Sequence, residues 1–265
     1  MFRTLASVCV AATIGTAAIA AEPPLTIYIA SDSTAQTYKP DRYPQTGWGQ
    51  MLPCAFGPDV VIHNEAIGGR STRSFIDEGR LDRIRQELKS GDTLLIQFGH
   101  NDADTKKPGR YAAPAGAYHD NLVKMVEVAR AAGAQPVLIT PVIRRHFVDG
   151  EVKADFAEWS NQMRIVAHEL KVPLIDLEAK SREWVERAGP ERSKRLYLHY
   201  TPADKIAAFP NGIDDDTHFS ELGARGVAEI IARELRGLKL PVSHRVLRVR
   251  PALERTEPLG STACN

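Results

Sequence analysis

The stretch NGIDDDTHFSELG places three consecutive aspartates directly before a threonine and a histidine. A carboxylate three or four residues before His218, about one helical turn away, can reach the imidazole Nδ1 and orient the ring as a general base. Asp214 and Asp215 have this spacing, and Asp216 has it poorly. Capping of a helix that begins near Ser220 explains the same polar run. The stretch therefore predicts either the base half of a catalytic site or a polar turn before a helix.

The same stretch does not fit a metal site. Calcium loops alternate their acidic ligands with other residues and end in a bidentate Glu, whereas these three aspartates are contiguous. Zinc normally takes more His or Cys ligands than His218 alone offers. Neither of the glycine-rich phosphate-binding patterns, G-x-x-x-x-G-K-[ST] and G-x-G-x-x-G, occurs. We therefore expect chemistry without a metal or another cofactor.

A base of this kind activates a nucleophile, and Ser33 in SDSTAQ follows directly on an apolar run. A serine between a buried strand and a helix presents its hydroxyl where backbone N–H groups stabilise developing negative charge. Ser31, Asp32 and Ser33 are also good helix caps, and capping is the commoner reason for such a serine. The G-x-S-x-G motif of the α/β hydrolases is absent, so a nucleophile here belongs to another architecture.

Two further polar segments follow apolar runs and could supply hydrogen-bond donors. IGGRS contains two adjacent glycines, which allow a backbone N–H to approach a ligand closely or simply form a turn. Asn101 in GHND can donate its side-chain amide to an oxyanion, or it can hold its own turn through an Asx bond.

Five short apolar runs predict the strands that would position these residues. They are LTIYIA (25–30), VVIHNEA (60–66), TLLIQFG (93–99), PVLIT (136–140) and PLIDL (173–177). Longer stretches with helical spacing lie between or after them, at 71–91, 115–133, 155–171 and 220–237. This alternation predicts a three-layer α/β/α sandwich around a mainly parallel five-stranded sheet. Because ligands bind beyond the carboxyl ends of such strands, the polar segments should meet at one edge of the sheet.

The order of these segments resembles the block pattern of the SGNH/GDSL hydrolases over nearly all of residues 25–236. The blocks are a serine after the first strand, glycine after the second, Gly-x-Asn-Asp after the third, and Asp-x-x-His before the last helix. The segments most similar to the rhamnogalacturonan acetylesterase-like branch are QTGWGQML, GGRSTRSF, QFGHND, TPVIRRHF and DDTHFSELGA. One departure is Ser31, which stands where Gly-Asp-Ser has its glycine. The resemblance implies a flavodoxin-like SGNH hydrolase fold.

The resemblance also implies roles for individual residues. Ser33 aligns with the nucleophile, His218 with the general base and Asp215 with its acidic partner. The backbone N–H of Gly69 and the side chain of Asn101 align with the oxyanion hole, beside the N–H of Ser33. These assignments imply a serine esterase that works through an acyl-serine intermediate and needs no cofactor. The other two aspartates of the stretch are then expected to be solvated turn residues.

The implied substrate is an acetylated polysaccharide, with rhamnogalacturonan of pectin as the expected polymer. Trp48, Tyr38, Arg70, Arg144 and His146 are candidates for a sugar-binding groove, in which a tryptophan stacks on a sugar and an arginine meets a uronate carboxylate. Core packing and surface charge are the alternatives for these residues. The alternative functions are an exported GDSL lipase or thioesterase and an acetylxylan-type esterase. A non-catalytic carbohydrate-binding protein is disfavoured because every catalytic residue type is present.

The overall composition and the two ends of the chain complete the prediction. The net charge of the 265 residues is +1, which suggests neither a nucleic-acid nor a membrane-surface partner. Residues 1–21 have the layout of a secretory signal peptide, so we expect export to the periplasm or the medium. Residues 22–240 then form the catalytic domain. Residues 241–265 lose the pattern and are expected to be an edge strand, a wrapping extension or disordered.

Two of the three cysteines remain after removal of the signal peptide. Cys54 and Cys264 could pair in an oxidising compartment, or Cys54 could be buried and Cys264 free. The sequence does not decide between these alternatives, and it does not predict an oligomeric state.

Overall fold

The computed structural model describes residues 24–264. The predicted signal peptide, residues 1–21, therefore lies outside the described residues. No helix in the described part of the chain is long and apolar enough to span a membrane.

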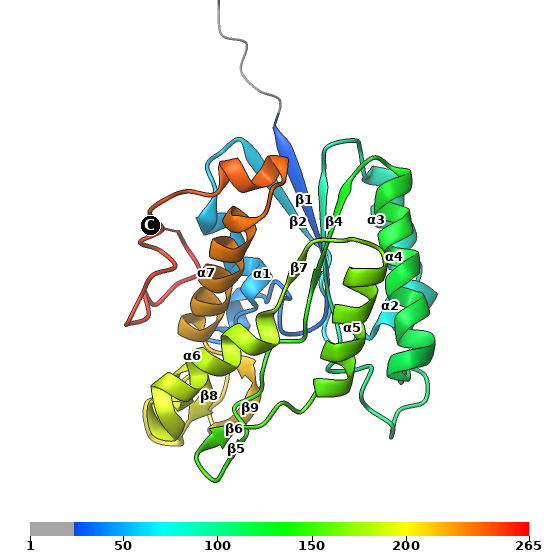
Figure 1. Cartoon of the computed structure of the whole chain (residues 1–265). Helices are drawn as coiled ribbons and strands as arrows, with labels where there is room; N and C mark the ends of the chain where they lie inside the picture. The colour runs from blue at the N-terminus through cyan, green and yellow to red at the C-terminus, as the bar shows by residue number, and fades with distance from the viewer. Residues whose placement is uncertain (1–23, 265) are drawn as a thin grey trace, which may run out of the picture.

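A five-stranded parallel sheet forms the centre of the molecule (Figure 1). Its strands are β1 Leu25–Ala30, β2 Val60–Asn64, β3 Thr93–Gln97, β4 Gln135–Ile139 and β7 Leu174–Ile175. Their spatial order is β2-β1-β3-β4-β7, and every neighbouring pair is parallel. The predicted mainly parallel five-stranded sheet is thus confirmed. Strands β2 and β3 end two residues earlier than the apolar runs predict, because the chain there leaves the ladder for the turns that carry the site.

Helices cover both faces of the sheet. They are α1 Trp48–Met51, α2 Thr72–Asp77, α3 Arg80–Glu87, α4 His119–Ala131, α5 Ala157–Glu169, α6 Leu177–Arg192 and α7 Glu221–Gly237. Short helical turns lie at η1 Pro40–Arg42, η2 Leu52–Ala55, η3 Pro114–Tyr118, η4 Ser193–Leu196, η5 Pro202–Asp204 and η6 Pro241–Arg245. Helices α1, α6 and α7 lie on one face, and α2 to α5 lie on the other (Figure 1). This arrangement is the predicted three-layer α/β/α sandwich.

The strands bury side chains on both faces, as a parallel sheet between two helical layers requires. In β1, Ile27 and Ile29 belong to the core shared with α1 and α7, whereas Tyr28 and Ala30 belong to the core shared with α2 to α5. This period of two follows from the pleat of the strand. Burying a large apolar side chain of this kind stabilises the fold by about 1.5–3 kcal/mol.

Several elements differ from the prediction. The stretch 71–91, predicted as one helical segment, is divided into α2 and α3. Gly79 separates them with a φ of 69°, in the left-handed region that ends a helix. Two antiparallel hairpins were not predicted. They pair β5 Phe147–Val148 with β6 Glu151–Val152, and β8 Tyr197–Tyr200 with β9 Ile213–Phe219.

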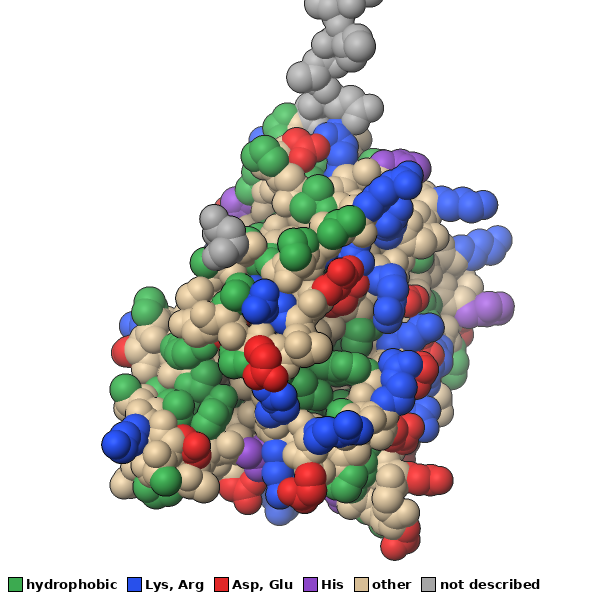
Figure 2. All heavy atoms as spheres, turned by 90° about the vertical axis from the view of Figure 1, so that its left-hand side faces the viewer, with side chains coloured by type: hydrophobic (Ala, Val, Ile, Leu, Met, Phe, Trp, Pro, Cys, Tyr) green, Lys and Arg blue, Asp and Glu red, His purple; other side chains and the backbone are tan. Residues whose placement is uncertain are grey.

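The chain after α7 wraps around that helix, which is one of the three alternatives left open by the sequence. Val246 forms a β-bridge with Phe56, and a disulfide joins Cys54 to Cys264. Arg225 of α7 is fully buried and donates hydrogen bonds to three backbone carbonyls of the extension. The extension is therefore attached by covalent and polar contacts. Figure 2 views this side of the molecule and shows charged side chains of both signs interspersed on it.

Candidate active site

The polar segments that follow β1, β2 and β3 meet at the carboxyl edge of the sheet, as predicted. Ser33 follows β1, Gly69 follows β2 and Asn101 follows β3. Because β1 lies between β2 and β3, these three residues come from adjacent strands. The N–H of Ile67 donates to the carbonyl of Ser31 (3.2 Å), which holds the first two segments together.

A chain of hydrogen bonds joins the three residues to which the family pattern gives the catalytic roles. His218 Nε2 lies 2.9 Å from Ser33 Oγ, and His218 Nδ1 lies 2.7 Å from Asp215 Oδ2. The serine and the histidine are 185 residues apart in sequence. The structure thus brings together a nucleophile, a base and an acid in hydrogen-bond contact, which is the geometry of nucleophilic catalysis.

The hydrogen bonds of Asp215 determine which nitrogen of the histidine carries a proton. Its Oδ1 accepts the backbone N–H groups of Thr217 (2.7 Å) and His218 (3.0 Å). Burial alone would raise the pKa of Asp215, but the hydrogen bond and charge of His218, with these backbone donors, lower it to about 2. An ionised carboxylate only accepts hydrogen bonds, so Nδ1 of His218 carries a proton. In the neutral ring, Nε2 then offers its lone pair to the hydroxyl of Ser33.

A bulge in β9 produces the contact between Asp215 and His218. Tyr197 pairs with Phe219, and the next residue of β8, Leu198, pairs with Asp215. The three residues between Asp215 and Phe219 therefore have no partners in the ladder, and the strand bends there. The predicted spacing of three residues was correct for the contact. The predicted helical turn was wrong, because the segment is a bulged strand.

Three hydrogen-bond donors follow β1, β2 and β3 at the same edge of the sheet as the nucleophile. Neither the N–H of Ser33 nor that of Gly69 has a hydrogen-bond partner within residues 24–264. Gly69 has a φ of 78°, which a residue with a side chain adopts only with strain. Asn101 donates one amide hydrogen to the carbonyl of Arg70 (3.0 Å), which leaves the second hydrogen of its NH₂ group for another acceptor. This arrangement can stabilise an oxyanion.

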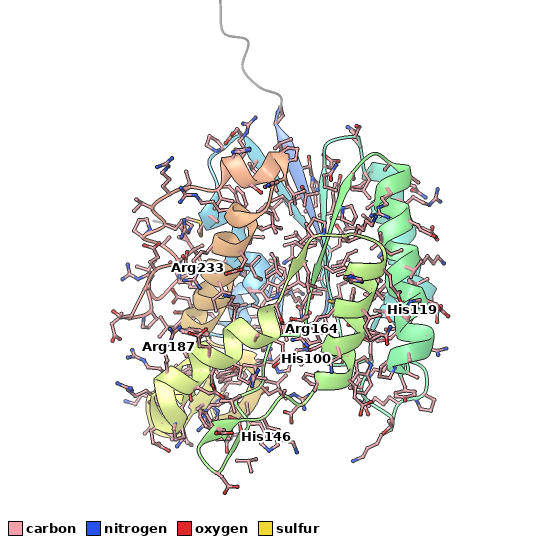
Figure 3. The ribbon with its side chains drawn as sticks, in the orientation of Figure 1. His100, His119, His146, Arg164, Arg187 and Arg233 are labelled. Atoms are coloured by element: carbon pink, nitrogen blue, oxygen red, sulfur yellow. A yellow bond between two sulfur atoms is a disulfide. The ribbon has the colours of Figure 1, made fainter. Side chains whose placement is uncertain are left out.

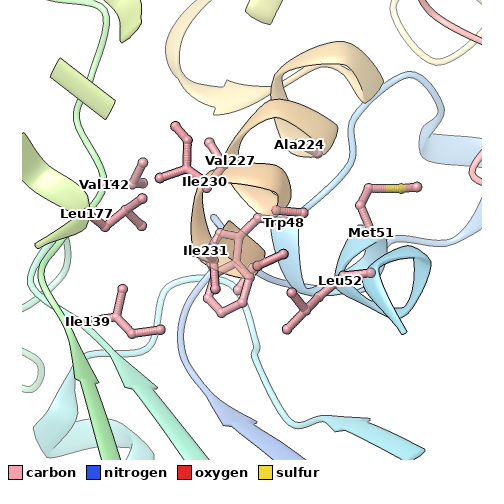
Figure 4. Packing of buried hydrophobic residues seen from close by; sticks show 14 of the residues in the cluster. Trp48, Met51, Leu52, Ile139, Val142, Leu177, Ala224, Val227, Ile230 and Ile231 are labelled. Atoms are coloured by element: carbon pink, nitrogen blue, oxygen red, sulfur yellow. The ribbon is translucent and has the colours of Figure 1, made fainter. Parts of the chain in front are cut away.

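Ser31, the departure from the family pattern, is accommodated by a buried amide. Its Oγ donates to Gln97 Oε1 (2.8 Å), which also accepts from Thr34 Oγ1 (3.0 Å) and Trp48 Nε1 (3.1 Å). The serine therefore links β1 to β3 beneath the nucleophile. Trp48 is fully buried among residues of α1 and α7 (Figure 4), so the prediction that it contacts a sugar was wrong. The alternative, core packing, describes it.

The residues next to Ser33 and Asn101 form a buried polar layer that the sequence analysis did not assign. Asp32 accepts from the backbone N–H of Thr34 (2.9 Å), and its other oxygen lies 3.6 Å from His100 Nδ1. Burial raises the pKa of Asp32, but the close approach of His100, with hydrogen bonds from Thr34, keeps it below its ordinary value. Burial raises the pKa of Asp102 to about 7, although Thr72 donates two hydrogen bonds to it. The sequence signal that could have identified these residues is their position inside the SDS and GHND motifs.

Two predicted sugar-contact residues instead stabilise the turns of the site. Arg70 forms an ion pair with Glu78 (3.1 Å) and donates to the carbonyl of Gly68 (2.8 Å). The hydroxyl of Tyr38 donates to the carbonyl of Ser33 (2.8 Å). Tyr38 also lines a cavity of about 370 Å³, whereas Arg70 does not line it. Tyr38 therefore both supports the turn and faces a cavity.

The structure separates the other two predicted substrate residues. Arg144 lines a cavity of about 320 Å³ together with Asn101. His146 lies beside the β5–β6 hairpin (Figure 3), forms an ion pair with Asp155 (2.8 Å) and does not line that cavity. Arg144 is therefore brought to the site, and His146 is not.

The remaining two aspartates of the opening stretch are paired, not merely solvated. His199 lies between them, with Nδ1 2.6 Å from Asp214 and Nε2 2.8 Å from Asp216. Arg145 also pairs with Asp216 (2.7 Å). These contacts tie the β8–β9 hairpin to the segment after β4. Across the described residues, no group of three or more His, Cys, Asp or Glu side chains could hold a metal ion.

Comparison with known sequences finds relatives that are ester hydrolases. Residues 32–225 match the model of the GDSL-like lipase/acylhydrolase family. Rhamnogalacturonan acetylesterase RhgT of Bacillus subtilis is 42% identical over 220 residues, which cover 83% of this chain and 93% of that protein. The probable rhamnogalacturonan acetylesterase YesY of the same organism is 38% identical over 84% of this chain and 98% of its own length.

Solved structures agree on the fold. The crystal structure of protein YxiM from Bacillus subtilis superimposes with a TM-score of 0.69 at 30% identity, over 81% of this chain and 56% of that one. The acetylxylan esterase Axe2 from Geobacillus stearothermophilus has a TM-score of 0.55 at 16% identity, over 80% of this chain and 93% of its own. At that identity the second likeness concerns the fold alone.

Proposed function

The chain belongs to the GDSL-like lipase/acylhydrolase family, and we propose that this carboxylic ester hydrolase removes acetyl groups from rhamnogalacturonan. One observation carries the proposal. The hydrogen-bonded chain of Ser33, His218 and Asp215 lies at a sheet edge with two backbone N–H groups that have no partner in the described part of the chain. The substrate is taken from the names of the two relatives that align over most of their length.

The first half of the reaction forms an acetyl-serine. Ser33 Oγ attacks the carbonyl carbon of the ester, and His218 Nε2, which is 2.9 Å away, takes the hydroxyl proton. Asp215 stabilises the resulting imidazolium through the bond at Nδ1. The negative charge on the carbonyl oxygen is received by the N–H groups of Ser33 and Gly69 and the amide of Asn101. Each donor of this kind contributes roughly a hundred- to a thousandfold in rate.

The second half regenerates the enzyme. The imidazolium of His218 gives its proton to the departing sugar oxygen, so a sugar hydroxyl leaves and the acetyl group stays on Ser33. Water then enters, loses a proton to Nε2 of His218 and attacks the acetyl carbonyl. Collapse of this second tetrahedral species releases acetate and returns the proton to Ser33. No step needs a cofactor.

The alternative enzymes place different demands on the surface beside the nucleophile. A lipase or long-chain thioesterase needs an apolar trench there, whereas the cavity that contains Asn101 is lined by Lys106, Arg110 and Arg144. A non-catalytic binding protein has no need of a complete hydrogen-bonded triad. Both alternatives are therefore less well supported than a carbohydrate acetylesterase.

Acetate release tests the proposal. Purified protein that begins at residue 22 should release acetate from acetylated rhamnogalacturonan and cleave 4-nitrophenyl acetate. Ser33→Ala should lower both activities by about ten-thousandfold or more, because the nucleophile is removed. Ser90→Ala is the matched control, since Ser90 is exposed and precedes β3, at the opposite end of the sheet from the site. Full activity of Ser33→Ala would show that the nucleophile is another residue.

We also propose that the protein is exported. The N-terminal sequence pattern supports export, and so does the disulfide between Cys54 and Cys264, because such bonds persist in oxidising compartments. N-terminal sequencing of protein recovered from the periplasm or the medium should find a start at residue 21 or 22. Recovery of the full-length chain from the cytoplasm alone would contradict export.

A further inference from the structure

A cavity of about 320 Å³ opens beside the proposed oxyanion hole, and we call it the cationic cavity. Asn101, Arg110, Arg144 and Phe156 are among its lining residues. Arg110 also approaches the carbonyl of Gly69 (3.4 Å). The cavity therefore shares Asn101 with the proposed oxyanion hole and lies against the glycine turn.

Arg144 carries the main unbalanced charge of the cationic cavity. Its side chain is half-buried, and its guanidinium carbon lies 4.9 Å from the centre of the Phe156 ring. Its Nε is buried without a hydrogen-bond partner, and no carboxylate of residues 24–264 forms an ion pair with Arg144. The next residue, Arg145, is by contrast paired with Asp216. A half-buried cation that lacks an acidic partner favours an anion from outside the protein.

The other charged residues of the cationic cavity leave a positive balance. Arg110 is paired with Asp104 (2.5 Å), so these two charges offset each other. Lys106 is exposed at the rim, and its ammonium has no ion pair within the described residues. Three cations therefore face one carboxylate, and the cavity attracts negative charge.

We propose that the cationic cavity binds the carboxylate of a uronic acid residue, with Arg144 as its main partner. The proposal rests on the proposed function, because the uronate carboxylate is the anionic group of an acetylated rhamnogalacturonan. A guanidinium matches the planar carboxylate with two parallel N–H donors. The ring of Phe156 supports the flat guanidinium from one side. Asn101 lines the same cavity, so a sugar held in this way lies beside one of the proposed oxyanion donors.

The geometry gives a reason for selectivity among acetylated polymers. A neutral acetylated xylan has no anion to place against Arg144, so binding it leaves the guanidinium without a partner. A uronate-containing chain supplies that partner at the moment of binding. Loss of one charged hydrogen-bonded contact typically corresponds to roughly a ten- to hundredfold loss in kcat/KM.

The experiment compares two forms of one substrate. Acetylated rhamnogalacturonan oligosaccharides are used in two forms, the native form and a form in which the carboxylates have been reduced to primary alcohols. For each enzyme, kcat/KM on each form is divided by kcat/KM on 4-nitrophenyl acetate. In the unmodified enzyme this ratio should fall roughly ten- to hundredfold on reduction of the carboxylates. Arg144→Gln should show a similar loss on the native oligosaccharide and almost no further loss on the reduced one.

Controls separate the possible failures. Arg85→Gln on α3 removes an exposed arginine that does not line the cavity and should preserve the discrimination. If the unmodified enzyme deacetylates both forms equally, or Arg144→Gln lowers both equally, the uronate site is wrong while the esterase assignment stands. If the unmodified enzyme cleaves 4-nitrophenyl acetate but neither oligosaccharide, the proposed substrate is wrong and the uronate site with it. The comparison of native and reduced oligosaccharides on the unmodified enzyme tests the proposal even if Arg144→Gln does not fold.

Discussion

Replacement of Asp215 by asparagine should invert the protonation of His218. Oδ1 of Asp215 accepts two backbone N–H groups, those of Thr217 and His218, while Oδ2 faces the imidazole Nδ1. Asparagine has one oxygen, and only an oxygen can occupy the position that faces two N–H donors. Its NH₂ group must then point at Nδ1, which has to become the acceptor. The ring proton moves to Nε2 and faces Ser33, where a lone pair is required.

The expected loss follows from this tautomer. A histidine that presents N–H to the nucleophile cannot take its proton, and in serine hydrolases this change lowers kcat by about ten-thousandfold. In contrast, Asp215→Ala leaves the ring free to adopt either tautomer. We therefore expect the alanine variant to retain more turnover than the asparagine variant, although alanine removes more atoms.

Turnover of 4-nitrophenyl acetate by the two variants tests this reasoning. Asp214→Asn is the matched control, because the neighbouring side chain is 89% exposed and pairs with His199 instead. It should retain nearly full turnover, and thermal unfolding should show that all variants are folded. Turnover of Asp215→Asn within tenfold of the unmodified enzyme would refute the argument from the two backbone donors. Greater activity of asparagine than of alanine would refute the tautomer argument.

Three further predictions concern stability. The folded-state pKa of Asp215 is about 2, below its ordinary 3.8. Its carboxylate should therefore add up to about 2 kcal/mol of stability that is complete above about pH 5 and lost progressively as the pH falls towards about 1. Urea unfolding at several pH values should show that Asp215→Asn lacks this dependence. Arg225→Met should lower the free energy of unfolding by about 3–5 kcal/mol, because Glu221 loses its buried partner, and the Tm by roughly 6–20 °C. An unchanged Tm would contradict that role for Arg225. Ser31→Gly should cost about 1–2 kcal/mol in urea unfolding, through loss of the bond to Gln97 and greater freedom of the unfolded chain, with turnover near that of the unmodified enzyme. A stabilised glycine variant would show that the serine is strained.

The sheet could be predicted because its strands are buried on both faces and therefore read as continuous apolar runs. The β8–β9 hairpin could not be predicted in this way. β9 consists largely of aspartates, a threonine and a histidine, and β8 has only four residues, with His199 between Leu198 and Tyr200, so neither reads as a continuous apolar run. Their pairing depends on contacts between segments far apart in sequence, which a local pattern does not contain.

A motif predicts the residues of the hydrogen-bonded triad, whereas a residue type alone does not predict a contact with the substrate. Trp48 and Arg70 have residue types that often contact sugars, but one is fully buried and the other pairs with Glu78. The structure distinguishes Arg144 from its neighbour Arg145, because Arg145 pairs with Asp216 while Arg144 has no ion-pair partner among residues 24–264. Whether a charged residue has a partner depends on three-dimensional proximity, which the sequence does not give.

The spacing of an acid and a histidine does not by itself make a base. Asp59 lies four residues before His63, and this spacing also satisfies the one-turn argument. Yet Asp59 pairs with Arg245, and His63 stacks on Tyr28 with 5.0 Å between ring centres. Here β2 begins at the residue after Asp59 and pairs with β1 in an unbroken register. In β9 the bulge brings the side chains of Asp215 and His218 into contact. The unpredicted strand β8 is therefore part of the catalytic site, since its register creates the bulge that joins the acid to the base.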